Sequence, residues 1–106
     1  MKILTTFYSK VNGTTFANSQ ELIKTLQPEE PLELIPEPTN KFDKNAIKIV
    51  YKGQKLGYLP RDTAESFGKQ VPEGAKFMAE VSEITGAGKS NAGCNIKVVI
   101  YQDEEN

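Results

Sequence analysis

Alternating apolar and polar positions recur along most of the chain and predict β-strands. Six segments combine this alternation with β-branched and aromatic residues: 2–11, 32–35, 46–51, 54–59, 77–84 and 94–101. Inward-facing positions on these strands are expected at Ile3, Phe7, Val11, Ile47, Ile49, Phe77, Ala79 and Val81. Lys52-Gly53 predicts a tight turn, and therefore a hairpin, between the third and fourth of them. Short strands at such close spacing favour a small β-barrel.

A first short helix is predicted just after the opening strand. Asn18 is followed three residues later by Glu21, the pattern of a capping box. The helix would extend to about Leu26 and bury Leu22, Ile23 and Leu26.

A second short helix is predicted after Pro60, a residue favoured at the start of a helix. Asp62 or Thr63 would cap it, and Gly68 would end it near Lys69. Its inward residues would be Ala64 and Phe67. Together with the strands, this predicts a mainly β domain of about six strands and two short helices over residues 1–101. Residues 102–106 would form a frayed acidic tail.

Composition excludes several kinds of chemistry. The 106 residues leave room for one core only. The chain has no His, which removes His-based catalysis and metal sites, and a single Cys, which cannot form an internal disulfide. No apolar run approaches the length of a membrane span. We therefore expect a cytoplasmic monomer without membrane contact, cofactor or metal, and not an enzyme.

Three local patterns suggest chemistry but favour simpler interpretations. The GAGKS segment at 86–90 lacks a P-loop's first glycine, because Glu83 occupies that position. Cys94 opens an apolar strand with no basic cluster nearby, which favours a structural thiol. The four Glu residues of segment 28–37 could hold a divalent cation, but they lack the Asp/Asn/Gly pattern of such loops. A solvated acidic segment is the better interpretation.

Charge is distributed unevenly along the chain. The net charge is only −1, which argues against a protein that coats long nucleic acids. Residues 40–61, however, contain six basic side chains against one acidic, and the aromatic residues Phe42, Tyr51 and Tyr58 lie among them. Cations beside flat rings suit single-stranded nucleic acid, because rings stack on bases while cations meet phosphates. The alternative is a solubilising outer strand whose rings belong to the core.

The segment EPTNKFDKNAIKIVYKGQKLGYLPRD (37–62) resembles the HIRAN domain family. The first block of the family pattern is matched by Glu37, Pro38, Asn40, Phe42, Asp43, Asn45, Ala46 and Ile47. The second block is matched by residues 57–61 (GYLPR), and upstream VNGTTF (11–16) resembles the opening segment of the family. The likeness covers about residues 7–101. It implies an oligonucleotide-binding β-barrel that holds single-stranded DNA at its 3′-hydroxyl end.

The resemblance also implies roles for individual residues. Phe42 would stack on the terminal base, and Asp43 would accept a hydrogen bond from the 3′-hydroxyl. Asn40 would read the base edge or hold the loop, and Phe16 would line the pocket. Tyr58 and Arg61 would contact phosphates. Lys41 and Lys44, which belong to the basic stretch, are further candidates for DNA binding.

Some positions depart from the family pattern, and some have a structural alternative. Thr15 stands where a phosphate-binding Arg is expected, and Gly93 where a stacking aromatic is expected. Tyr58 replaces a His, and Phe42 replaces a Tyr. Asp43 would equally well support its own loop through an Asx turn.

The sequence thus predicts a non-enzymatic module for single-stranded DNA, recognising 3′-hydroxyl ends in DNA repair or replication-fork processing. A helicase or nuclease would act in trans. The alternative is a protein-interaction module in which the acidic segment and the basic hairpin dock such a helicase or nuclease partner.

Overall fold

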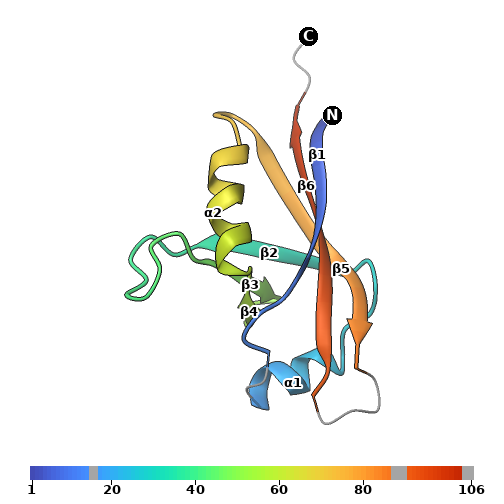
Figure 1. The fold of residues 1–106 in the computed structure, drawn as a ribbon. Coiled ribbons are helices and arrows are strands. Elements are labelled where there is room, and N and C mark those ends of the chain that lie inside the picture. The colour runs from blue at the N-terminus through green and yellow to red at the C-terminus, as the bar shows by residue number, and fades with distance from the viewer. Residues whose placement is uncertain (15–16, 87–90, 104–106) are drawn as a thin grey trace.

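Strands alternate with two short helices along the part of the chain that the computed structural model describes, residues 1–14, 17–86 and 91–103 (Figure 1). The strands are β1 (Lys2–Lys10), β2 (Pro31–Pro36), β3 (Ile47–Tyr51), β4 (Gln54–Tyr58), β5 (Lys76–Thr85) and β6 (Gly93–Gln102). The helices are α1 (Ala17–Ile23) and α2 (Arg61–Gln70). The predicted set of six strands and two helices is confirmed.

All six strands join one antiparallel sheet in the order β1-β6-β5-β2-β3-β4. The sheet curls until its two edges approach each other. Just beyond β1, Asn12 donates its backbone N–H to the carbonyl of Tyr58 and accepts the N–H of Tyr58, at 2.8 and 2.9 Å. This single bridge joins the two edges without a continuous ladder. The architecture is therefore a mainly β fold whose sheet is not strictly closed, which is compatible with the OB-like barrel implied by the family resemblance.

Gly57 permits that closure. A β-carbon at this position would lie 2.3 Å from the carbonyl oxygen of Asn12 and 2.6 Å from Val11. The backbone of Asn12 cannot move aside as a flexible side chain can. Only glycine therefore fits at the point of β4 where the segment after β1 crosses it.

The core fills the barrel and extends under α2. The expected inward residues Ile47, Ile49, Ala79 and Val81 are buried. From α2, the ring of Phe67 packs edge-on between two strand residues, with centroids 6.2 Å from Phe7 and 5.1 Å from Phe77. Figure 1 shows α2 alongside the sheet and α1 below it.

One predicted inward position in β1 is wrong. Ile3 is 55% exposed, whereas Phe7 is partly buried and Val11 is buried. The pairing of β1 with β6 shifts register between Ile3 and Thr5, so one extra residue interrupts the alternation. A bulge of this kind turns the residues before it to the opposite face of the sheet.

The predicted capping box of α1 is also wrong. The helix begins at Ala17, so Asn18 lies inside it and is not its cap. The buried side was predicted correctly, because Leu22, Ile23 and Leu26 are all buried.

The start and the end of α2 differ from expectation as well. Pro60 occupies the cap position in an extended conformation, and no side chain caps the helix, so neither Asp62 nor Thr63 has that role. The helix passes through Gly68 and ends at Gln70. Ala64 and Phe67 face inward as predicted.

The end of the chain is more ordered than a frayed tail from residue 102 would be. Gln102 belongs to β6, where it pairs with Lys2, and Asp103 forms an ion pair with Lys76. Residues 104–106 lie outside the described part of the chain. Neither described helix is long and apolar enough to cross a membrane.

Candidate nucleic-acid interface

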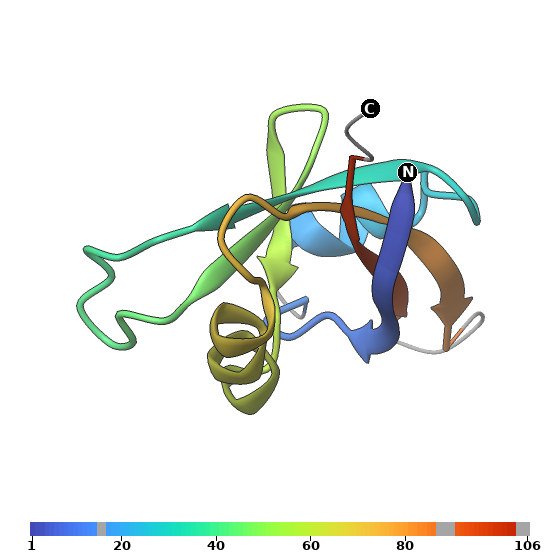
Figure 2. The ribbon, with the colours of Figure 1, turned by 90° about the horizontal axis from the view of Figure 1, so that it is seen from above.

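The connection between β2 and β3, residues 37–46, projects from the body of the barrel (Figures 1 and 2). Its two ends are joined, because the backbone N–H of Glu37 donates to the carbonyl of Ala46 at 2.9 Å. We call this segment the 37–46 loop, and it contains most of the first block of the family pattern. It carries five of the predicted site residues: Asn40, Lys41, Phe42, Asp43 and Lys44.

Asn40 holds the tip of the 37–46 loop. Its side-chain oxygen accepts the backbone N–H groups of Phe42 and Asp43 at 2.9 and 3.1 Å. Its side-chain amide donates to the carboxylate of Glu37 at 3.2 Å. Three hydrogen bonds from one side chain fix the shape of the tip, which is the loop-holding role of the two roles predicted for Asn40.

Glu37 connects the loop to the sheet. Its carboxylate lies 3.6 Å from the ammonium group of Lys48 in β3. Hydrogen bonds, first from Asn40 and then from Tyr58, lower the pKa of Glu37, and the charge of Lys48 lowers it further. Burial, and then the nearby Glu37 carboxylate, raise the pKa of Tyr58. Glu37 therefore stays ionised and ties the loop to two strands at once.

Phe42 is the most exposed aromatic side chain recorded among the described residues, with 92% of its surface accessible. A groove of about 410 Å³, lined by residues 36–42, lies beside it. A ring exposed in this way, on a loop whose tip is closed by the hydrogen bonds of Asn40, is free to stack on a flat ligand.

Asp43 links the 37–46 loop to α2. One carboxylate oxygen accepts the backbone N–H of Asn45 at 2.9 Å, which makes the Asx turn considered from the sequence. The other lies 3.8 Å from the guanidinium of Arg61, the first residue of α2. The side chain of Asp43 is 18% exposed and that of Arg61 is 77% exposed. The ion pair therefore presents its cation to solvent, while the carboxylate of Asp43 is largely covered.

The remaining predicted residues lie at different distances from this centre. Tyr58 is half-buried on β4, next to Glu37, and Lys55 lies over its ring at 5.4 Å. Lys41 and Lys44 are exposed on the 37–46 loop. Phe16 and the departing position Thr15 lie outside the described residues.

The departure at Gly93 has a structural correlate. Gly93 pairs with Thr85 at the start of β6, and a β-carbon there would lie 2.6 Å from the hydroxyl oxygen of Thr85. An aromatic residue at this position would need Thr85 to move. The chain therefore lacks a stacking ring at this site.

The competing chemical readings find little support in the described residues. Cys94 is 2% exposed, and burial raises the pKa of its thiol to about 11, so a structural thiol is confirmed. Two of the four acidic side chains of segment 28–37 are engaged: Glu37 in the loop and Glu30 with the hydroxyl of Tyr51 at 2.6 Å. No group of three or more potential metal ligands occurs among the described residues. Residues 87–90 of the GAGKS segment are outside them.

Sequence reasoning did not identify the role of Glu37. The residue was matched to the family pattern, yet its connection to Lys48 and Tyr58 depends on the pairing of three strands. One signal was available, since Glu37 and Asn40 are three residues apart around Pro38, the spacing of a turn closed by side chains.

Comparison with known proteins gives one family and two similar folds. The family model HIRAN domain matches residues 4–103. The crystal structure of the HIRAN domain of human HLTF superposes with a TM-score of 0.69 at 19% identity, covering 97% of this chain and 80% of that one. A protein from Lactobacillus plantarum gives a TM-score of 0.72 at 18% identity, covering 96% of both chains. No curated protein matches the sequence.

Proposed function

Because the chain belongs to the HIRAN domain family, a family of DNA-binding domains, we propose that it binds the 3′-hydroxyl end of single-stranded DNA without catalysing a reaction. The observation that carries the proposal is the exposed ring of Phe42, held beside the Asp43–Arg61 pair by the hydrogen bonds of Asn40. A role in DNA repair or fork processing is consistent with such a ligand.

Each group at this centre suits one part of a DNA end. The ring of Phe42 stacks on the terminal base, a contact worth about 1–3 kcal/mol. Asp43 has acceptor capacity left after its bond to Asn45, because each carboxylate oxygen offers two lone pairs. It accepts a hydrogen bond from a 3′-hydroxyl and repels a 3′-phosphate. The exposed guanidinium of Arg61 binds the phosphate that precedes the terminal nucleoside.

Titration with short oligonucleotides ending in 3′-hydroxyl or 3′-phosphate tests the proposal. The 3′-hydroxyl form should bind more tightly, and Phe42→Ala should weaken its binding about tenfold, as expected for the loss of one stacked base. Asp43→Asn keeps an oxygen for the backbone N–H of Asn45 but removes the charge, so it should reduce the discrimination between the two ends. Equal affinity for both ends, unaffected by either variant, would overturn the proposal.

A second candidate is the docking of a helicase or nuclease partner, and the outer face of β1 favours it. Tyr8 is 66% exposed, Ile3 is 55% exposed, and Met78 on β5, which β6 separates from β1, is 44% exposed. Apolar groups gathered on one face often mark a protein interface. In a pull-down, DNA bridges are first removed with an added nuclease, and the helicase or nuclease partner that stays bound to the protein is then measured. Tyr8→Asp should abolish the retention of this partner and leave the affinity for oligonucleotides unchanged. Retention that survives this substitution would exclude the face.

A further inference from the structure

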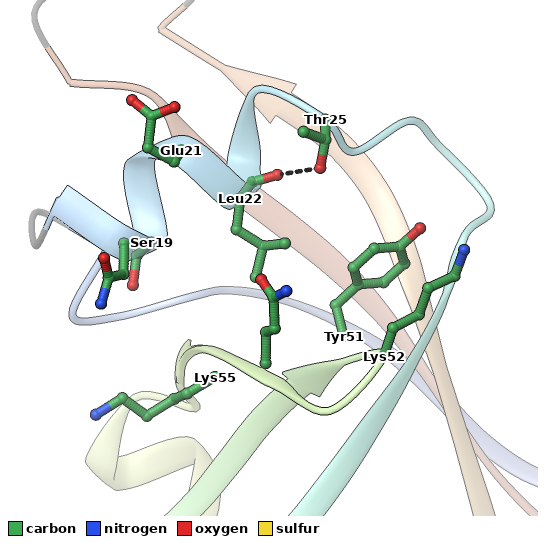
Figure 3. A pocket seen from close by; sticks show the side chains of 9 residues that line it. Ser19, Glu21, Leu22, Thr25, Tyr51, Lys52 and Lys55 are labelled. Atoms are coloured by element: carbon green, nitrogen blue, oxygen red, sulfur yellow. Dashed lines mark hydrogen bonds between the residues drawn. The ribbon is translucent and has the colours of Figure 1, made fainter.

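A groove of about 870 Å³ lies between α1 and the end of the β3–β4 hairpin (Figure 3). We call it the α1–hairpin groove. Leu22 projects from α1 toward the hairpin, while Tyr51 and Lys52 lie at one end of the groove and Lys55 at the other. The groove is separate from the 37–46 loop, since the two lie at opposite ends of β3.

The cations of the groove lie against aromatic rings. The ammonium group of Lys52 lies 5.3 Å from the ring centre of Tyr51, and that of Lys55 lies 5.4 Å from the ring centre of Tyr58. Among the described residues, the recorded ion pairs include neither lysine. A ring positions an ammonium group without cancelling its charge, so both lysines keep a positive charge that can attract an anion.

Two acidic side chains, Glu21 and Glu30, lie near these cations. Glu21 lines the groove, but its carboxylate pairs with Lys24 at 3.4 Å. Glu30 accepts the hydroxyl hydrogen of Tyr51 at 2.6 Å and keeps its negative charge, since this hydrogen bond lowers its pKa and the nearby charge of Lys52 helps to lower it. Asn18 and Gln54, also in the lining, carry amides able to donate to phosphate oxygens. The lining thus combines cations and amide donors with the apolar surface of Leu22 and Tyr51.

Lys55 connects this groove with the candidate DNA-end site. It lines the groove, and its ammonium group lies over Tyr58, which borders the Glu37 carboxylate. Along β4, Tyr58 and Gln54 are about 13 Å apart at the usual rise of a strand. A few nucleotides of extended single strand span this distance.

We propose that the α1–hairpin groove binds the phosphodiester backbone of the nucleotides upstream of a 3′ end. The strand passes from Phe42 over Tyr58 and Lys55 to Lys52, and the groove extends the binding site by several nucleotides. This inference rests on the proposed function, because the path of the strand starts from the 3′ end bound at Phe42.

Affinity as a function of oligonucleotide length tests the path. A dinucleotide and an octanucleotide, both ending in 3′-hydroxyl with the same last two bases, are titrated against wild type and the double variant Lys52→Gln/Lys55→Gln. The octanucleotide should lose about tenfold in affinity with the variant, and the dinucleotide less than twofold. For the octanucleotide, the slope of log affinity against log salt concentration should become shallower by about 1.4 in the variant, the value for two lost phosphate contacts on a single strand.

The double variant Lys10→Gln/Lys69→Gln is the matched control. It removes the same charge from exposed positions on β1 and α2 and should leave both affinities unchanged. Thermal unfolding should show that both double variants remain folded.

The outcomes separate this inference from the proposed function. If the octanucleotide binds the groove variant as tightly as wild type, or if both lengths lose affinity equally, the path is wrong and end binding stands. If Phe42→Ala leaves every affinity unchanged, or wild type binds neither oligonucleotide, the proposed function fails and the path with it.

Discussion

The loop before β3 and the turn after it lie at the two ends of one strand, and they are held by different means. The 37–46 loop has ten residues and is fixed by side chains, chiefly those of Asn40, Asp43 and Glu37. The turn after β3 has two residues, Lys52 and Gly53, and both have positive φ, 47° and 82°. That is the backbone of a type I′ turn, which suits the twist of a hairpin.

The difference explains which end can present a ring to a ligand. Backbone geometry alone fixes a two-residue turn, so its side chains are free to fold back, as Lys52 does over Tyr51. A ten-residue loop needs internal hydrogen bonds to keep one shape. Once Asn40 provides them, Phe42 can stay exposed without packing against the protein. Binding then costs less ordering entropy than a mobile loop would require.

The largest change in stability should come from the hairpin side, where the backbone of β4 packs tightly against the segment after β1. Gly57→Ala places a β-carbon 2.3 Å from the carbonyl oxygen of Asn12, and should lower the free energy of unfolding by about 3 kcal/mol. Gly68→Ala is the control, because nothing lies within 4 Å of its β-carbon position in α2. That substitution should stabilise the protein by roughly 0.5–1 kcal/mol. Urea unfolding measures both; similar stabilities for the two variants would show that the closure at Gly57 is loose.

The loop side should respond less in stability and more in binding. Asn40→Ala removes three hydrogen bonds from a half-exposed site, and should lower the free energy of unfolding by about 1–2 kcal/mol. It should also weaken oligonucleotide binding, although Phe42 itself is unchanged. Asn45→Ala, at an exposed position of the same loop that does not line the groove beside Phe42, should alter neither quantity. If Asn40→Ala leaves the affinity unchanged, the ring does not depend on a fixed loop.

The sequence was sufficient for features that depend on neighbouring residues. Alternation located the strands, and Lys52-Gly53 located the hairpin turn, because both follow from local backbone preferences. The family resemblance assigned Asp43 and Arg61 to one site, but it did not predict that the two side chains form an ion pair. That contact needs the end of the loop and the start of α2 to meet in space.

Features set by distant pairing were not predictable in the same way. The bulge between Ile3 and Thr5 adds one residue without changing the composition of β1, so the alternation alone missed it. Gln20 of α1 binds both backbone groups of Ala92, 72 residues away, at 2.8 and 2.9 Å. The α1–hairpin groove likewise exists only because α1 packs near the hairpin. No local pattern carries such information.

A smaller gain in stability is expected from the turn. Lys52 has a positive φ, which costs most side chains energy but is well tolerated by Asn. Lys52→Asn creates the Asn-Gly pair preferred in type I′ turns, and should raise the free energy of unfolding by about 0.5 kcal/mol after the loss of the Tyr51 contact. Chemical denaturation measures the change. A loss of stability would mean that the cation over Tyr51 matters more than the backbone.

The smallest effect should be a pH response confined to the loop side. Hydrogen bonds from Asn40 and Tyr58 lower the pKa of Glu37 from its ordinary value of 4.5, so the native state favours the carboxylate. A group with a lowered native pKa contributes its stability above the ordinary pKa and loses it as the pH falls through the native value. The side-chain amide signals of Asn40, followed by NMR from pH 7 downward, should therefore shift below pH 4.5, while the amide signal of Gly53 stays constant. Glu37→Gln keeps an oxygen for Asn40 but does not titrate, so the shift should disappear in that variant. A shift that persists would assign the titration to another acid, and Asp43 would be the next to replace.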